Sequence, residues 1–171
     1  PMSISSALGA VIMPRTSNLI AEERMDEFKA LVQKSYDFIF ALAMPLMVGL
    51  IFTSPSAVLL LSGEGFVPAI LTSQIVAFNI LTVGLSGVMG IQVLYPLGKI
   101  NIVILCTSIG AIINVFLNVL LIPRYGHNGT AVAYMLAEMT VTVSMFFIGK
   151  RYIPIRFLKR QHLNYVLGSV D

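Results

Sequence analysis

Charged residues are scarce in this chain. Of its 171 residues, 11% are Asp, Glu, Lys or Arg, whereas 57% are hydrophobic. A soluble globular domain carries about 25% charged residues. A chain of this length keeps much of its surface in contact with its surroundings, so a large buried core does not explain the shortfall. The composition therefore excludes an ordinary soluble domain and indicates a membrane protein.

Several features of enzymes are also missing. No G-x-x-x-x-G-K-[ST] stretch occurs, which excludes nucleotide hydrolysis by a P-loop. His127 and His162 have no carboxylate or thiol at ligand spacing, so we expect no metal site and no cofactor. Glu138 is the one carboxylate deep within an apolar segment, whereas an intramembrane hydrolase needs a second acid or a Ser–His pair. We therefore expect a protein that is not an enzyme.

The sequence shows no signal-peptide pattern and contains a single cysteine. The chain opens on Pro1 without the charged and apolar regions that precede a cleavage site. We therefore expect it to be a piece of a longer protein, cut inside a helix. Cys106 is the single cysteine, which excludes an intrachain disulfide.

Long uncharged intervals fill most of the chain. A membrane-spanning helix needs roughly 20 mostly apolar residues. We predict an all-α, polytopic transmembrane helix bundle, in which residues 36–149 form four spans. The predicted spans lie near residues 36–56, 70–95, 101–122 and 129–149. We predict that residues 1–14 are the end of another transmembrane helix and that residues 15–35 form a cytoplasmic amphipathic segment. Residues 150–171 are predicted to form a basic cytoplasmic tail.

The segment before the first full span has a helical period of its own. Between Pro14 and Ser35, apolar residues recur mostly at steps of three and four, and charged residues fill the gaps. This pattern predicts one amphipathic helix. Such a helix lies at the membrane surface or packs on its own protein with one face in water, and the pattern leaves both open.

Basic residues indicate the orientation. Ten of the 11 Lys and Arg residues fall in alternate connections: Arg15, Arg24, Lys29, Lys34, Lys99, Lys150, Arg151, Arg156, Lys159 and Arg160. The two opposite connections hold Arg124 alone. The positive-inside rule therefore places the first set in the cytoplasm. The basic residues mark a membrane face that attracts anionic lipid, and we expect no nucleic-acid partner.

One acid interrupts the last predicted span. The stretch "LIPRYGHNGTAVAYMLAEM" resumes an apolar run and places Glu138 near its middle. An ionisable residue at that depth costs about 2.5–3.5 kcal/mol on insertion scales, so Glu138 should face the bundle interior or a wet cavity. Tyr134 and Thr142, four residues to either side, share its face. The acid either contacts a proton, a cation or a sugar, or stays protonated and bonds to a neighbouring helix.

Amides and hydroxyls occur on the two preceding spans. Asn114 and Asn118 lie one turn apart, and Asn79 shares a face with Thr82 and Ser86. Polar residues of this kind line ligand cavities or join helices, and we favour a ligand role for the amide pair. The proposed substrate or ion pathway comprises Glu138, Asn114, Asn118, Tyr134, Thr142, Asn79 and Arg15.

Proline and glycine mark two further positions. Pro45 and Gly49 predict a kink or hinge in the first full span, a common feature of transporters. Pro123, Gly126 and Gly129 predict a tight turn between the last two spans.

The order and spacing of these segments resemble a known family. "SGEGFVPA", "QVLYPLGKINIVI" and "GAIINVFLNVLLIPRYGHNGTAVAYMLAE" are similar to successive blocks of polysaccharide flippases. These are the Wzx-type members of the multidrug/oligosaccharidyl-lipid/polysaccharide exporter superfamily. The last block carries Asn114, Asn118, Pro123, Gly126, Gly129 and Glu138 at the family's spacings. The resemblance implies a two-lobe transporter with a central cavity, of which this chain is part of the second lobe.

The same resemblance implies a function. Such proteins flip undecaprenyl-diphosphate-linked oligosaccharides, such as O-antigen or capsule repeat units, across the bacterial cytoplasmic membrane by alternating access. A proton or sodium gradient is the expected coupling. The expected partners are membrane lipid, the lipid-linked oligosaccharide, the first lobe, a polysaccharide polymerase and glycosyltransferases. A multidrug/cation antiporter of the same superfamily is one alternative, and a membrane scaffold in a polysaccharide assembly complex is another.

Overall fold

The computed structural model describes residues 2–152 and contains helices but no strands within that range. Its elements are α1 (Met2–Ala21), α2 (Met25–Ser62), the 3-10 helix η1 (Glu64–Phe66), α3 (Ala69–Ala77), α4 (Asn79–Gly87), the π-helix η2 (Val88–Leu94) and α5 (Ile100–Gly149). The predicted all-α helix bundle is confirmed. The predicted basic tail after Tyr152 lies outside the described residues.

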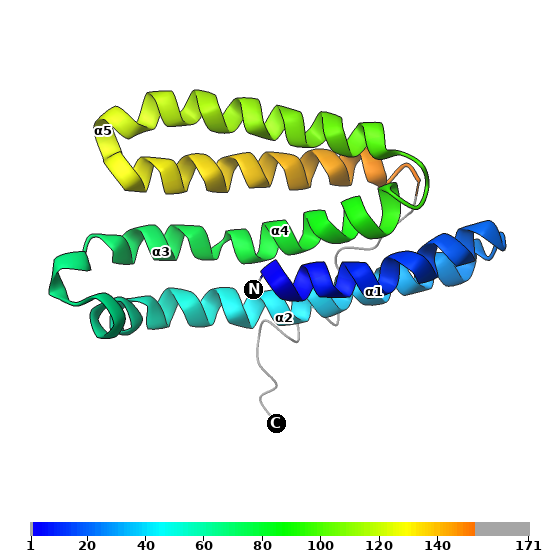
Figure 1. The fold of residues 1–171 in the computed structure, drawn as a ribbon, viewed down its shortest axis with the longest axis horizontal. Coiled ribbons are helices and arrows are strands. Elements are labelled where there is room, and N and C mark those ends of the chain that lie inside the picture. Colours follow the sequence, from blue (N-terminus) through cyan, green and yellow to red (C-terminus); the bar gives the residue numbers. More distant parts are fainter. Residues whose placement is uncertain (1, 153–171) are drawn as a thin grey trace.

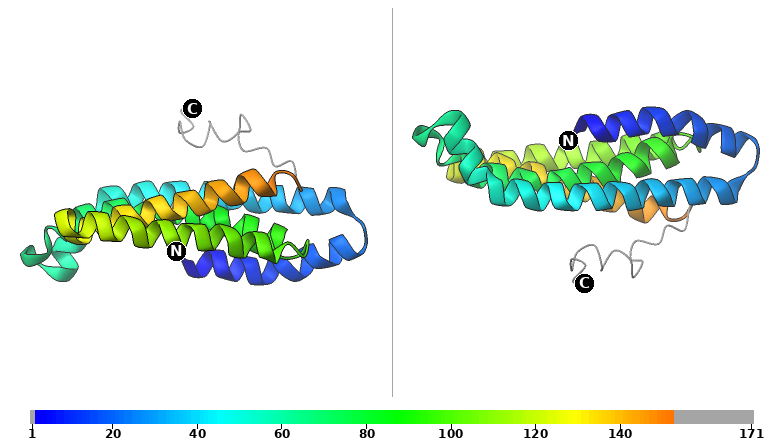
Figure 2. Two further views of the ribbon diagram at one scale, coloured as in Figure 1. Left: turned by 90° about the horizontal axis from the view of Figure 1, so that it is seen from above. Right: turned by 90° about the horizontal axis from the view of Figure 1, so that it is seen from below.

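The helices run roughly along one common axis. The two arms of α5 stack on the line formed by α3 and α4, and α2 lies on the opposite side of that line (Figure 1). Figure 2 shows α1 and α2 separated laterally and joined by a turn at one end of the bundle. Both helices contact α4, so α4 has neighbours on several sides.

The single amphipathic helix predicted over residues 14–35 is wrong. Helix α1 ends at Ala21 and α2 begins at Met25, and Glu23 between them has a positive φ of 58°. The Arg24 guanidinium holds the turn by donating to Glu22 (2.8 Å) and to both carboxylate oxygens of Glu27 (2.8 and 2.7 Å). The hydrogen bonds to Glu22 and then Glu27 raise the pKa of Arg24. The charges at these positions therefore stabilise a reversal of the chain, because Arg24 is bonded to one carboxylate before it in the sequence and to one after it.

Helix α2 is longer than a bilayer requires. Its 38 residues span about 57 Å at 1.5 Å per residue, against roughly 30 Å of hydrocarbon. The helix continues through Pro45 and Gly49 without a break, so their role as a hinge stays a prediction. Its last turns leave the line of the rest of the helix (Figure 1).

A proline inside α2 is compensated by two side chains. Pro55 has no N–H, so the carbonyl oxygen of Ile51, four residues earlier, loses its helical donor. The Ser54 hydroxyl (3.0 Å) and the Gln74 amide (3.1 Å) donate to this oxygen instead. Because Gln74 belongs to α3, the proline creates a contact that joins two helices.

The next candidate membrane span is built from three pieces. Ala69–Leu94 is long and apolar enough to cross a membrane. It is regular in α3, interrupted at Phe78, regular again in α4 and π-helical in η2. Single π turns inside helices frequently occur at functional sites. The short helix α4 is therefore bounded by an irregularity at each end.

Helix α5 folds back on itself. Its one non-helical residue is Gly126 (φ 54°, ψ −132°), a conformation that glycine adopts without steric cost. The turn predicted between Pro123 and Gly129 therefore lies at Gly126. Gly129 allows the two arms to meet, since a Cβ there would lie 2.7 Å from the Leu121 carbonyl oxygen.

The buried core lies towards the end of the bundle that carries the α1–α2 turn. It includes Phe28, Val32, Met89, Leu94 and Cys106, each at most 2% exposed. Most of α5 points large apolar side chains outward, and only 11% of its most apolar window is buried. Lipid tails accept such a surface, whereas water does not. The chain is a membrane protein, and its described residues 2–152 contain three segments long and apolar enough to span, of which α5 folds into two arms. The exact span limits stay predictions.

Candidate functional site

A cavity of about 520 Å³ lies between α4, η2 and the two arms of α5. Three of its lining residues are glycines: a Cβ at Gly87 would meet nothing within 4 Å, whereas Gly110 allows the two arms of α5 to approach, because a Cβ there would clash with the Val141 side chain. The lining residues are Val83, Ser86, Gly87, Gly90, Ile91, Val103, Thr107, Gly110, Ala111, Asn114, Val115, Tyr134, Ala137, Glu138, Val141 and Met145. No Lys, Arg or His is among them. The cavity therefore holds one acid and no base.

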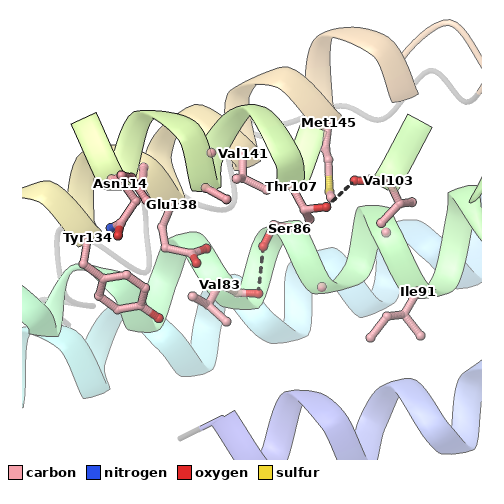
Figure 3. A pocket seen from close by; sticks show the side chains of 16 residues that line it. Val83, Ser86, Ile91, Val103, Thr107, Asn114, Tyr134, Glu138, Val141 and Met145 are labelled. Carbon is pink, nitrogen blue, oxygen red and sulfur yellow. Dashed lines mark hydrogen bonds between the residues drawn. The ribbon is translucent and has the colours of Figure 1, made fainter. Parts of the chain in front are cut away.

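Three predicted pathway residues meet in this cavity. Tyr134 and Glu138 point into it from the second arm of α5, and Asn114 enters from the first arm (Figure 3). Tyr134 and Glu138 are one helical turn apart, and the hairpin at Gly126 brings Asn114 opposite them. The cavity thus presents a carboxyl, a phenol and an amide against otherwise apolar walls.

The Glu138 carboxylate makes no hydrogen bond or salt bridge within residues 2–152. The alternative in which this acid bonds to a neighbouring helix therefore has no counterpart in the described structure. A partly buried carboxyl without a protein partner is suited to a ligand that donates hydrogen bonds or carries positive charge.

Asn118 supports Asn114 and does not line the cavity. Its Nδ2 atom donates to the Asn114 carbonyl oxygen (2.9 Å) and to the Asn114 side-chain oxygen (3.0 Å). The second bond occupies the acceptor of the Asn114 amide and leaves its NH₂ group for the cavity. The two amides therefore act as a pair in which one orients the other.

Three predicted pathway residues lie elsewhere. The Thr142 hydroxyl donates to the Thr82 carbonyl oxygen of α4 (3.0 Å) and to the Glu138 carbonyl oxygen (2.8 Å), so it joins two helices. Asn79 is 3% exposed, and neither side-chain atom has a hydrogen-bond partner in the described structure. Arg15 is exposed on α1 and is not part of the cavity lining.

Two hydroxyls line the cavity without having been placed in the predicted pathway. Ser86 donates to the Val83 carbonyl oxygen (3.2 Å), and Thr107 donates to the Val103 carbonyl oxygen (2.9 Å), as Figure 3 shows. The sequence held a signal for Thr107, because it precedes Asn114 by two helical turns on one face.

The tip of the α5 hairpin is attached to α3. The Thr72 hydroxyl donates to the Asn128 side-chain oxygen (2.6 Å), and the His127 Nε2 atom lies 3.4 Å from the Pro68 carbonyl oxygen. These contacts fix the end of the cavity wall at which the two arms of α5 join.

Comparisons with known proteins find a matching family and a relative. The model of a family described as "Lipid II flippase MurJ" matches residues 2–169. The chain is also 22% identical, over 164 residues, to the "Uncharacterized membrane protein MJ1068" of Methanocaldococcus jannaschii. That similarity covers 96% of this chain and 32% of the relative. The chain therefore spans about a third of the length of the relative that it matches.

Proposed function

The chain belongs to the MurJ family of lipid II flippases, and from this membership we propose that it supplies part of a transporter that moves a lipid-linked saccharide across a membrane by alternating access. The observation that carries the proposal is the cavity in which Glu138, Tyr134 and Asn114 meet. Binding a ligand there in two states with different access is sufficient for transport and requires no chemical conversion.

The proposed substrate is a saccharide carried on undecaprenyl diphosphate, and the proposed location is the bacterial cytoplasmic membrane. The family match favours lipid II. The O-antigen and capsule repeat units implied by the sequence resemblance share the polyprenyl diphosphate carrier. Because the cavity has an acid and no base, we assign it to uncharged hydroxyl groups or to a coupling proton or sodium ion, and not to the diphosphate.

Glu138→Gln tests the role of the acid in the full-length protein. Glutamine keeps the size and hydrogen-bonding capacity of the side chain but cannot ionise. We expect a normal membrane level and loss of export when the variant replaces the only flippase of a bacterial strain. Glu64→Gln is the matched control, because Glu64 is exposed outside the cavity and loses the same charge. Normal export by Glu138→Gln would remove the acid from the mechanism.

The substrate is tested by choosing the strain. Rescue of a strain depleted of its lipid II flippase identifies the peptidoglycan precursor, whereas restored surface polysaccharide in a strain without its O-antigen or capsule flippase identifies a repeat unit. An assembly scaffold would instead co-purify with a polymerase or glycosyltransferases and rescue neither strain.

The amide pair gives a second test. Asn114→Ala removes a lining group and Asn118→Ala removes the group that orients it. We expect both variants to keep nearly normal abundance, because hydrogen bonds inside membrane proteins contribute only about 0.6 kcal/mol on average. Export should fall in both. If abundance falls in step with export, the pair is structural.

A multidrug/cation antiporter is the second candidate, because a carboxyl without a protein partner in a cavity without a base also suits a cationic ligand. Expression would then protect cells against cationic drugs and rescue neither flippase strain.

A further inference from the structure

A second cavity, of about 240 Å³, lies between α2, α4, η2 and the second arm of α5. It is lined by Tyr36, Leu85, Met89, Thr142, Val143, Phe146 and Phe147. The Thr142 hydroxyl is already bonded to two carbonyl oxygens, so this residue presents no free donor there. An apolar cavity of about 150 Å³ binds benzene. The larger volume here suits several methylene groups of a hydrocarbon chain.

The walls of this cavity reach the outer surface of the bundle. Val143 is 49% exposed and Phe147 is 55% exposed, and both are on the arm of α5 that ends at Gly149. Residues this exposed and this apolar face lipid in a membrane protein. A chain from the bilayer can therefore enter the cavity without crossing the core.

A cation stands at the rim of the cavity. The Lys150 Nζ atom lies 4.5 Å from the centre of the Phe147 ring, within the range of a cation–π contact. Lys99, from the connection after η2, lies at the same end, with its Nζ atom 5.6 Å from the centre of the Tyr152 ring. Neither lysine forms a salt bridge within residues 2–152. Exposed Arg151 adds a third positive charge.

We propose that this end of the bundle binds an anionic phospholipid of the surrounding bilayer. The lipid phosphate pairs with Lys150, supported by Lys99 and Arg151, and the upper part of one acyl chain occupies the cavity beside Phe147. The arrangement matches the two parts of such a lipid, since a charged rim stands directly over an apolar hollow. The proposal does not depend on which substrate the protein transports.

The charge of Lys150 sets the expected preference for anionic lipid. A basic residue next to an anionic lipid surface strengthens binding about fivefold. Lys150→Gln should therefore reduce the preference for anionic over zwitterionic lipid about fivefold, and Lys150→Arg should keep it. Arg124→Gln is the matched control, because it removes the same charge beside the Gly126 turn, at the tip of the α5 hairpin and away from Lys150.

The test uses the full-length protein in nanodiscs. All native cysteines, including Cys106, are replaced by alanine, and a bimane label is attached through Val143→Cys. Brominated phosphatidylglycerol should quench the label at a lower mole fraction than brominated phosphatidylcholine. Lys150→Gln should remove most of this difference, and Arg124→Gln should not. A label on Val119→Cys, 73% exposed on the other arm, should be quenched equally by both lipids.

Three results would overturn the proposal. Equal quenching of the Val143 label by both lipids would show that the rim does not select anions. Absence of quenching by either lipid would show that another part of the protein covers the cavity. Relief of quenching by one equivalent of undecaprenyl diphosphate, with no competition from excess phosphatidylglycerol, would assign the cavity to the transported lipid.

Discussion

Replacing Gly129 by alanine should separate the two arms of α5. A Cβ atom at this position would lie 2.7 Å from the carbonyl oxygen of Leu121 and 2.8 Å from its carbonyl carbon. Both atoms belong to the backbone of the facing arm, so no side-chain rotation relieves the clash. Added volume in a packed site typically costs about 1–3 kcal/mol, and a contact with backbone belongs in the upper half of that range.

Gly49→Ala is the matched control. Gly49 also lies inside a helix, but a Cβ atom there meets nothing within 4 Å. Replacing a mid-helix glycine with alanine should stabilise the helix by roughly 0.5–1 kcal/mol, since glycine loses more backbone entropy on folding. The two substitutions add the same methyl group and should therefore change stability in opposite directions.

Hydrogen exchange measures the effect locally. Amides near the turn at Gly126 should exchange about 30- to 150-fold faster in Gly129→Ala, which corresponds to the upper half of that cost when exchange follows local opening. Exchange in the same peptides should not change in Gly49→Ala. Equal protection of the turn in wild type and Gly129→Ala would refute the close approach of the arms.

Two further predictions concern orientation and the compensated proline. Cysteines at Asn128 and Lys99, in a Cys106→Ala background, should react with an impermeant thiol reagent from opposite sides of the membrane. Labelling of both cysteines from the outside of intact cells would contradict the predicted orientation. Gln74→Ala should destabilise the protein by about 0.6–1.7 kcal/mol in SDS titration, because it removes a donor to the carbonyl freed by Pro55. The loss should shrink in a Pro55→Ala background, where the backbone N–H returns, and an unchanged loss would contradict the compensation.

The features that follow from composition and from special residues could be predicted from the sequence. The helical membrane class follows from the bilayer, which accepts only apolar segments with internally bonded backbones. The turn in α5 follows from Gly126, because its positive φ suits glycine. The reversal at Glu23 could not be predicted, since no glycine or proline marks it and the apolar period continues across it. The break at Phe78 likewise has no sequence signal.

The candidate site was only partly predictable for a geometrical reason. A stripe with a period of four winds around a helix of 3.6 residues per turn by about 40° at each step. Tyr134 and Glu138 still face one cavity, but Thr142 has turned towards α4, where it bonds to the Thr82 carbonyl oxygen. Which neighbour each face meets depends on tertiary packing, and a single periodicity does not contain that information.

The hairpin of α5 bears on how the chain enters the bilayer. A lone helix carrying Glu138 would expose the acid to lipid tails during insertion, at a cost of about 2.5–3.5 kcal/mol. The short reversal at Gly126 keeps the first arm beside the second, so the amide of Asn114 and the acid face a shared interior space. We therefore expect the two arms to enter the bilayer together as a hairpin. Each arm then shields the polar groups of the other from lipid before further helices are inserted.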